Sequence, residues 1–164
     1  MMNKQYELNK NELELRVKKA PLFVRTVMFF FTFLFFLLPF TGMILGLAMG
    51  KGMHIGYVIG LFFFGILGFY MLRISLWNTC GKETITFENN YLIYIADYGW
   101  FKDGKKQKEL KNPLVYSIRQ IGYEEDNKGG LIIGLEEPII CVTKMPNAEL
   151  EELIDKLNDL DNKQ

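Results

Sequence analysis

The sequence has few of the side chains that hold metal ions or carry out covalent chemistry. Among its 164 residues there are two cysteines and one histidine, with no C-x-x-C pair. A metal site needs several converging ligands, so we expect no bound metal and no cofactor. A disulfide between Cys80 and Cys141 would need an oxidising compartment, which the topology argued below does not provide. We expect Cys80 to be an inert packing residue rather than a reactive thiol.

Motifs of the common catalytic families are also missing. There is no G-x-S-x-G, Walker loop or H-E-x-x-H, and the two serines, Ser75 and Ser117, have no base nearby in sequence. Carboxylates are plentiful, but none stands in an apolar setting that would raise its pKa. We therefore predict that the protein is not an enzyme.

The chain has no excess of charge of either sign. Its 19 Lys and Arg residues balance 19 Asp and Glu residues, which gives no bulk attraction to nucleic acid. Twelve of the 14 phenylalanines lie between Phe23 and Phe69, so the aromatic excess belongs to two apolar runs and not to a base-stacking surface. Nucleic acid is not an expected partner.

Two long apolar runs dominate the first half of the chain. Residues 26–50 contain no charged side chain, residues 52–72 contain no Asp, Glu, Lys or Arg, and Lys51 alone separates them. At a rise of about 1.5 Å per residue, each run covers the roughly 30 Å hydrocarbon core of a bilayer. We predict a first transmembrane helix in 22–50, then a tight extracytoplasmic turn and a second transmembrane helix in 51–76.

Positive charge flanks the first run on one side. The basic residues before it are Arg16, Lys18, Lys19 and Arg25. Cytoplasmic flanks carry the excess of Lys and Arg, while the loop offers only Lys51 and the far flank offers Arg73 and Lys82. We predict that both termini are cytoplasmic. A cleaved signal peptide is the competing interpretation, but the run is too long and no A-x-A site follows it.

Small residues recur every four positions on both sides of the predicted turn. Positions four apart share one helical face, and small side chains there let a neighbouring helix approach closely. The glycines concerned are Gly42, Gly46, Gly50, Gly52, Gly56 and Gly60. We expect them to pack the two helices together within one chain. Packing between two copies of the chain is the alternative, and the sequence does not choose between them.

Short alternating runs separated by turn signals follow the second apolar run. Within a domain over 77–164 we predict strands in 84–88, 91–97, 114–123, 131–135 and 139–143, with turns between them. A helix at about 147–160 closes the chain, because its apolar residues recur at helical spacing. These are Leu150, Leu153, Ile154, Leu157 and Leu160.

The cytoplasmic tail, residues 1–21, also contains a strand signal. Leu13, Leu15 and Val17 alternate with charged residues, which is the period of a half-buried strand. An isolated strand is not stable in water, so this one would have to pair with the domain beyond the second helix. A disordered or helical lead-in is the alternative.

These features resemble a family of uncharacterised bacterial two-transmembrane proteins with a membrane-proximal pleckstrin-homology-like (PH-like) domain. The residues that carry the resemblance are Trp77, Gly81, Glu83, Ile85, Tyr91 to Ile95, and Leu13 to Val17. The resemblance implies a membrane α+β fold: a transmembrane hairpin in the bacterial inner membrane, and a cytoplasmic β-sandwich or partly open barrel with a C-terminal helix. It implies no ligand, since one fold serves many functions.

Three surface features are candidate contact sites. The first is a basic cluster, Lys102, Lys105, Lys106, Lys108 and Lys111. It could touch the inner leaflet at about 1 kcal/mol per lysine, but we favour a solvated turn whose lysines protect a strand edge.

The second is the acidic face of the closing helix, which we expect to be solvated, with docking of a basic partner as the alternative. Its acids are Glu149, Glu151, Glu152, Asp155, Asp159 and Asp161. The third is Trp100 and Phe101, which we expect in the core, with an exposed interaction patch as the alternative.

The sequence thus predicts a non-enzymatic integral membrane protein whose cytoplasmic domain contacts protein or the inner leaflet. A homodimer is one form that such a protein contact could take. The alternative function is an accessory subunit of a larger membrane assembly, such as a transporter or secretion complex, or an immunity protein against a membrane-acting toxin.

Overall fold

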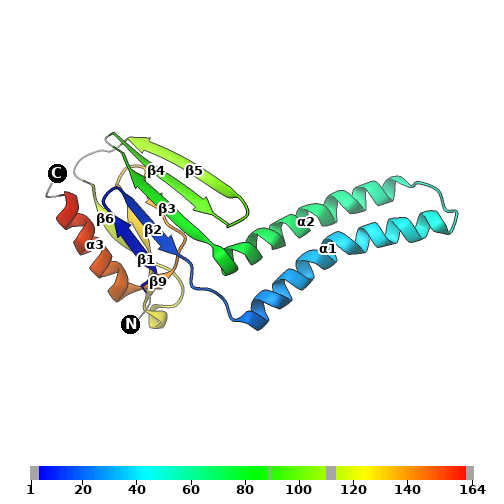
Figure 1. The fold of residues 1–164 in the computed structure, drawn as a ribbon, viewed down its shortest axis with the longest axis horizontal. Helices are drawn as coiled ribbons and strands as arrows, with labels where there is room; N and C mark the ends of the chain where they lie inside the picture. Colours follow the sequence, from blue (N-terminus) through cyan, green and yellow to red (C-terminus); the bar gives the residue numbers. More distant parts are fainter. Residues whose placement is uncertain (1–3, 89, 110–113, 162–164) are drawn as a thin grey trace. The chain divides into compact units, whose positions relative to one another are not determined.

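A computed structural model describes residues 4–88, 90–109 and 114–161 and divides the chain into two compact units (Figure 1). One unit combines Met1–Lys18 with Cys80–Gln164, and the other is Lys19–Thr79. The turn expected at Asn89–Asn90 lies partly outside the described residues, and Lys111 lies wholly outside them.

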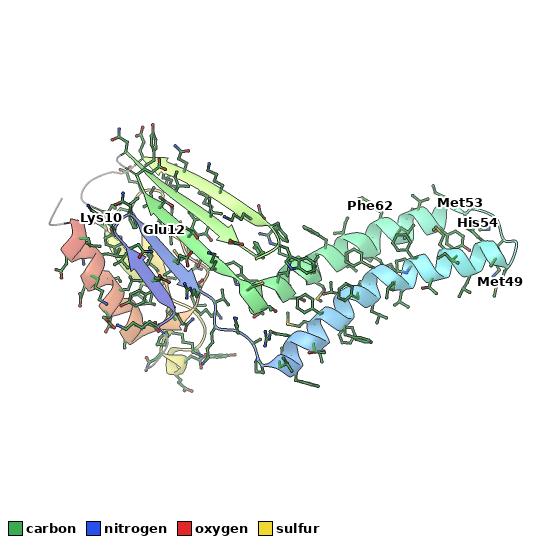
Figure 2. The ribbon with its side chains drawn as sticks, viewed as in Figure 1. Lys10, Glu12, Met49, Met53, His54 and Phe62 are labelled. Carbon is green, nitrogen blue, oxygen red and sulfur yellow. The ribbon has the colours of Figure 1, made fainter. Side chains whose placement is uncertain are left out.

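Two long helices, α1 (Leu22–Ala48) and α2 (Ile55–Cys80), make up the helical unit and run side by side in opposite directions (Figure 1). Residues 49–54 join them, and Met49, Met53 and His54 lie around this turn (Figure 2). Both helices are long and apolar enough to cross a membrane.

The turn occupies residues 49–54, and α2 ends at Cys80, four residues beyond the end of the predicted range 51–76. Gly50 and Gly52 have φ of 73° and 69°, a conformation that glycine adopts without a Cβ clash. At its other end α2 continues through Asn78 and Thr79, whose side chains donate to the carbonyls of Ile74 and Ser75 at 2.9 and 2.7 Å. Gly50 and Gly52 therefore lie in the turn, where their positive φ favours glycine.

The two helices touch through a few side chains. The hydroxyls of Thr32 and Ser75 lie 3.2 Å apart and buried, and the rings of Phe35 and Phe64 lie 6.0 Å apart between centroids. In the most apolar stretch of each helix, only 6% of the residues are buried. Most of the apolar surface of α1 and α2 therefore points away from the contact between them.

Strands β1 (Tyr6–Asn9), β2 (Glu12–Arg16), β3 (Lys82–Phe87), β4 (Tyr91–Asp97) and β5 (Lys102–Glu109) form an antiparallel sheet in chain order. In its register, Leu13 pairs with Ile85 and Leu15 with Glu83. The strand expected in the tail is therefore present as β2. It pairs with β3, which follows α2 in the chain, as expected because a single strand is not stable in water. Strands β1 and β5 were not predicted.

A second antiparallel sheet contains β6 (Tyr116–Gln120), β7 (Lys128–Ile133), β8 (Ile139–Ile140) and β9 (Met145–Pro146), with β7 paired to the other three. Strand β7 begins at Lys128, three residues before the strand expected in 131–135, and so includes Gly129 and Gly130. A Cβ on Gly129 would lie 2.5 Å from the Ile118 side chain, and one on Gly130 would lie 2.9 Å from the Cys141 carbonyl oxygen. The glycines therefore allow close approach of neighbouring strands.

Helix α3 (Asn147–Asp161) packs against β6, β7 and β9 and buries its leucine stripe. Leu150 and Leu153 are fully buried, together with Leu13, Leu15 and Ile85 of the first sheet. The second sheet adds Leu131, Ile133, Ile139 and Met145 to this core. The predicted α+β class is confirmed: two long apolar helices, antiparallel sheets and a C-terminal helix.

Candidate functional site

The turn between β4 and β5 lies directly against the last residue of α2. The Cys80 thiol donates to the Tyr98 carbonyl oxygen at 3.3 Å, and a Cβ on Gly99 would lie 2.7 Å from the Cys80 sulfur. Gly99 also has a φ of 86°, a backbone conformation that residues with a Cβ rarely adopt. This turn is therefore held against Cys80.

The same turn is closed by backbone and aromatic contacts. The Tyr98 N–H donates to the Phe101 carbonyl at 2.9 Å, and the two rings stack with centroids 4.9 Å apart. Gly99 and Trp100 are the two loop residues between them, and Trp100 is 70% exposed. The expectation that Trp100 lies in the core is wrong, because a loop position in a two-residue turn directs its side chain outward.

A row of charged residues crosses the first sheet at the strand ends that connect to α1 and α2. The register places Arg16 beside Lys82, Lys82 beside Asp97, and Asp97 beside Lys102. The Lys82 ammonium lies 2.7 Å from Glu14; this hydrogen bond lowers the pKa of Glu14 and raises the pKa of Lys82. Lys102 is 4.0 Å from Asp97, with its side chain 68% exposed.

The basic cluster was expected to lie in a turn. Its described lysines instead belong to the edge strand β5. Lys102 and Glu109 are separated by about 23 Å at the usual strand rise. Lys108, near the far end, donates to the carbonyl and the carboxylate of Glu137. The four described lysines, Lys102, Lys105, Lys106 and Lys108, are therefore spread along an edge, and only Lys102 follows the Trp100 turn directly.

The most deeply buried charge-bearing side chain is one that sequence reasoning missed. Glu83 on β3 is fully buried. One carboxylate oxygen accepts from the Tyr94 hydroxyl at 2.6 Å and the Val142 N–H at 2.7 Å, and the other accepts from the Thr143 N–H at 2.7 Å. Burial of a carboxylate here, with all of these donors around it, was not foreseen from the sequence. Glu83 is in phase with Ile85 on the inward face of β3, and that alternation is the signal that could have revealed it.

The surroundings of Glu83 are closed to water. Burial, followed by the Glu83 charge, raises the pKa of both the Tyr94 hydroxyl and the Cys141 thiol. Because Val142 and Thr143 give their N–H groups to Glu83, β8 stops at Ile140 and the predicted strand over 139–143 is shortened. This arrangement joins the two sheets and offers a reactant no route to the carboxylate.

The glycine face expected to pack α1 against α2 does so at one position. At Gly46 a Cβ would lie 1.9 Å from the Tyr57 hydroxyl, but at Gly42, Gly56 and Gly60 it would meet no atom within 4 Å. For these three glycines the described chain provides no close neighbour, and the use of this face stays a prediction. An unpredicted contact occurs at Gly68, where a Cβ would lie 2.9 Å from the Phe36 ring.

The acidic face of α3 is partly engaged by the N-terminal segment. Glu149 accepts from the Gln5 N–H, and Glu152 pairs with both Lys4 and Lys156. The hydrogen bonds from Lys156 and Lys4 lower the pKa of Glu152 to about 2. The expectation of a solvated face therefore needs correction, because these side chains tie α3 to the segment just before β1.

Within the described ranges, no group of three or more His, Cys, Asp or Glu side chains is arranged to hold a metal ion. Comparisons with protein-family models, with curated proteins and with solved structures found no match for this chain. The fold itself defines an α+β protein with two helices able to cross a membrane.

Proposed function

We propose that the protein is a non-enzymatic integral membrane protein of the bacterial inner membrane, in which α1 and α2 span the bilayer as a hairpin. Its cytoplasmic β domain, which we take to be PH-like, contacts other proteins or the inner leaflet. The observation that carries the proposal is the pairing of β2, which precedes α1, with β3, which follows α2. A chain that leaves and rejoins one sheet must enter and exit the bilayer on the same side.

The outward surface of the two helices supports insertion in a bilayer. Phe23 and Phe62 are 77% and 71% exposed, and Phe62 points away from α1 (Figure 2). Exposed apolar surface costs about 25 cal/mol per Å² in water, and extended apolar patches mark contact with membrane or protein. A core helix of a soluble protein would instead be mostly buried, unlike α1 and α2.

The order of the elements supports the PH-like assignment. Two antiparallel sheets precede a single helix, and that helix packs against the second sheet at the C-terminal end of the chain. The fold does not dictate what the domain binds. The proposal of a contact role comes from the surface features, the Trp100 turn and the edge strand β5.

A second candidate function, an accessory subunit of a membrane assembly, is favoured by the open glycines. Gly56 and Gly60 are four residues apart on α2, and a Cβ at either would meet no atom of the described neighbouring elements within 4 Å. Small residues at that spacing let another transmembrane helix approach closely. The same face would serve a second copy of the chain, in which case the assembly is a homodimer.

Alkaline carbonate extraction and topology reporters test the main proposal. We expect the full chain to stay with the membrane pellet. Reporters active only in the cytoplasm should work when fused at either terminus, and reporters active only outside it should work when inserted at Lys51. Release by carbonate, or a periplasm-active enzyme that works behind Gln164, would overturn the proposal.

A further inference from the structure

The end of α2 lies at the depth of the lipid headgroups if α2 spans the bilayer. Its 26 residues extend about 39 Å at 1.5 Å per residue, whereas the hydrocarbon core is about 30 Å thick and the bilayer with its headgroups about 40–45 Å. A helix that starts at the far boundary of the core therefore brings Cys80 into the near headgroup layer. This step rests on the proposed function.

The Trp100 turn is held at that depth by contacts with Cys80. The Cys80 thiol donates to Tyr98, and Gly99 lies against the same sulfur. Trp100 is the next residue, one Cα step of about 3.8 Å further on. The Gly99 N–H also donates to the Asp97 carboxylate at 2.8 Å, so the turn is held from within as well as by the helix.

The chemistry at the tip of the turn matches a lipid interface. An indole has a large apolar ring and one N–H donor, and tryptophan is enriched where membrane meets water. Here the ring is 70% exposed. Lys102, two residues later, has a side chain that is 68% exposed, and its ammonium lies as far as 4.0 Å from Asp97, so it can also face a second anion.

We propose that Trp100 is an interfacial anchor: its indole lies in the headgroup layer of the leaflet beside the end of α2, and Lys102 beside it faces anionic phospholipid headgroups. The partner is the lipid surface rather than a protein, because a hydrogen bond and a close approach hold the turn against Cys80, the last residue of a span. The anchor sets the domain against the leaflet through one point of the sheet and not through the whole of β5.

The chain offers an internal reference for the test, since Trp77 on α2 is its only other tryptophan. The full chain is reconstituted into vesicles of phosphatidylcholine and phosphatidylglycerol in two forms, Trp77→Phe and Trp100→Phe, each with one tryptophan left. Lipids brominated at different depths of the acyl chain then quench the remaining indole. We expect the Trp100 emission to be quenched most by bromine near the headgroups, to an extent comparable to that of Trp77.

The outcomes separate the two proposals. Quenching of Trp77 together with an unquenched Trp100 overturns the anchor, leaves the transmembrane hairpin standing, and makes a protein partner the better account of the exposed indole. Failure of both tryptophans to be quenched overturns the membrane proposal itself. Quenching of both supports the anchor.

A matched pair of lysine variants tests the role of charge. In the Trp77→Phe background, Lys102→Gln should reduce quenching of Trp100 in anionic vesicles, whereas Lys108→Gln, at the other end of β5, should leave it unchanged. Equal effects of the two variants would overturn the assignment of Lys102 to the anchor. Bilayers of phosphatidylcholine alone should remove the difference between wild-type Lys102 and Lys102→Gln.

Discussion

The carboxylate of Glu83 accepts a hydrogen bond at 2.7 Å from the backbone N–H of Thr143, 60 residues later in the chain. Glu83 belongs to the first sheet, and Thr143 follows β8 of the second. The same carboxylate also accepts hydrogen bonds from the Val142 N–H and the Tyr94 hydroxyl. A single buried side chain thus satisfies donors from both sheets.

Removal of this carboxylate should destabilise the β domain severely. In Glu83→Ala, two buried donors and the part-buried Val142 N–H lose their acceptor. An unsatisfied buried donor costs about 1–3 kcal/mol, so we expect a loss of about 3–5 kcal/mol in the free energy of unfolding. Denaturant titration of the full chain in micelles, followed by tyrosine and tryptophan fluorescence, measures it. Glu14→Ala is the control, because its surface pair with Lys82 should contribute about 1 kcal/mol or less. Equal losses in the two variants would contradict the role assigned to Glu83.

Local sequence pattern was sufficient for the elements that carry their own signal. The apolar runs predicted both long helices, and the alternation of Leu13 and Leu15 predicted a strand that had to find a partner. Strand β5 has no such signal, because Lys102–Glu109 contains no apolar side chain. It forms through backbone pairing with β4, a tertiary interaction that no window of sequence contains.

The site residues divide in the same way. Burial of Glu83 follows from the period-two phase of β3, but its partners Val142 and Thr143 are brought to it by the fold of the second sheet. The four-residue spacing of Gly56 and Gly60 on α2 predicts a shared helical face but not whether that face meets α1 or the surroundings. The exposure of Trp100 depends on the hydrogen bond from the Tyr98 N–H to the Phe101 carbonyl that closes its turn. The aromatic character of the residue alone had favoured burial.

The contrast between Gly46 and Gly60 predicts different effects of the same substitution. Gly46→Leu collides with the Tyr57 side chain and should weaken the hairpin by about 1–3 kcal/mol, the usual cost of overpacking. Gly60→Leu meets open space and should leave the hairpin intact. The measurement is disulfide formation between Thr32→Cys and Ser75→Cys, whose hydroxyls are 3.2 Å apart, in a chain with Cys80 and Cys141 replaced by serine.

An equal loss of this disulfide in both glycine variants would contradict the packing of α1 on α2. The same variants address association between chains. If Gly60→Leu abolishes crosslinking between two copies and keeps the intramolecular disulfide, the open face of α2 is the contact between chains.

Cys141 should report opening of the β domain. Its thiol is buried, and burial raises its pKa, so little of it is a reactive thiolate in the folded state. In Cys80→Ser, we expect a water-soluble disulfide reagent at pH 8 to label Cys141 at least about 100-fold more slowly than in the unfolded chain, because labelling requires local opening. The Glu83→Ala variant should label faster than Glu14→Ala, and rapid labelling of the otherwise wild-type domain would contradict its closed core.

Acid should weaken the tie between α3 and the N-terminal strand. Hydrogen bonds from Lys156 and Lys4 lower the pKa of Glu152 to about 2, below the ordinary glutamate value of about 4.3. A group with a lowered folded-state pKa stabilises the fold above its unfolded pKa and loses that contribution as the pH falls toward the folded value. The contribution of Glu152 should therefore be complete at pH 7, decline below about pH 4.5 and be largely gone near pH 2.

Melting temperatures of wild type and Glu152→Gln across this range measure the effect. Wild type should melt higher at pH 7, and the two proteins should converge as the pH falls toward 2, since the protonated carboxyl no longer attracts the ammonium groups. Glu151→Gln, an exposed neighbour on α3, is the control and should track wild type throughout. A gap between wild type and Glu152→Gln that stays constant with pH would show that the side chain acts through packing and not through its charge.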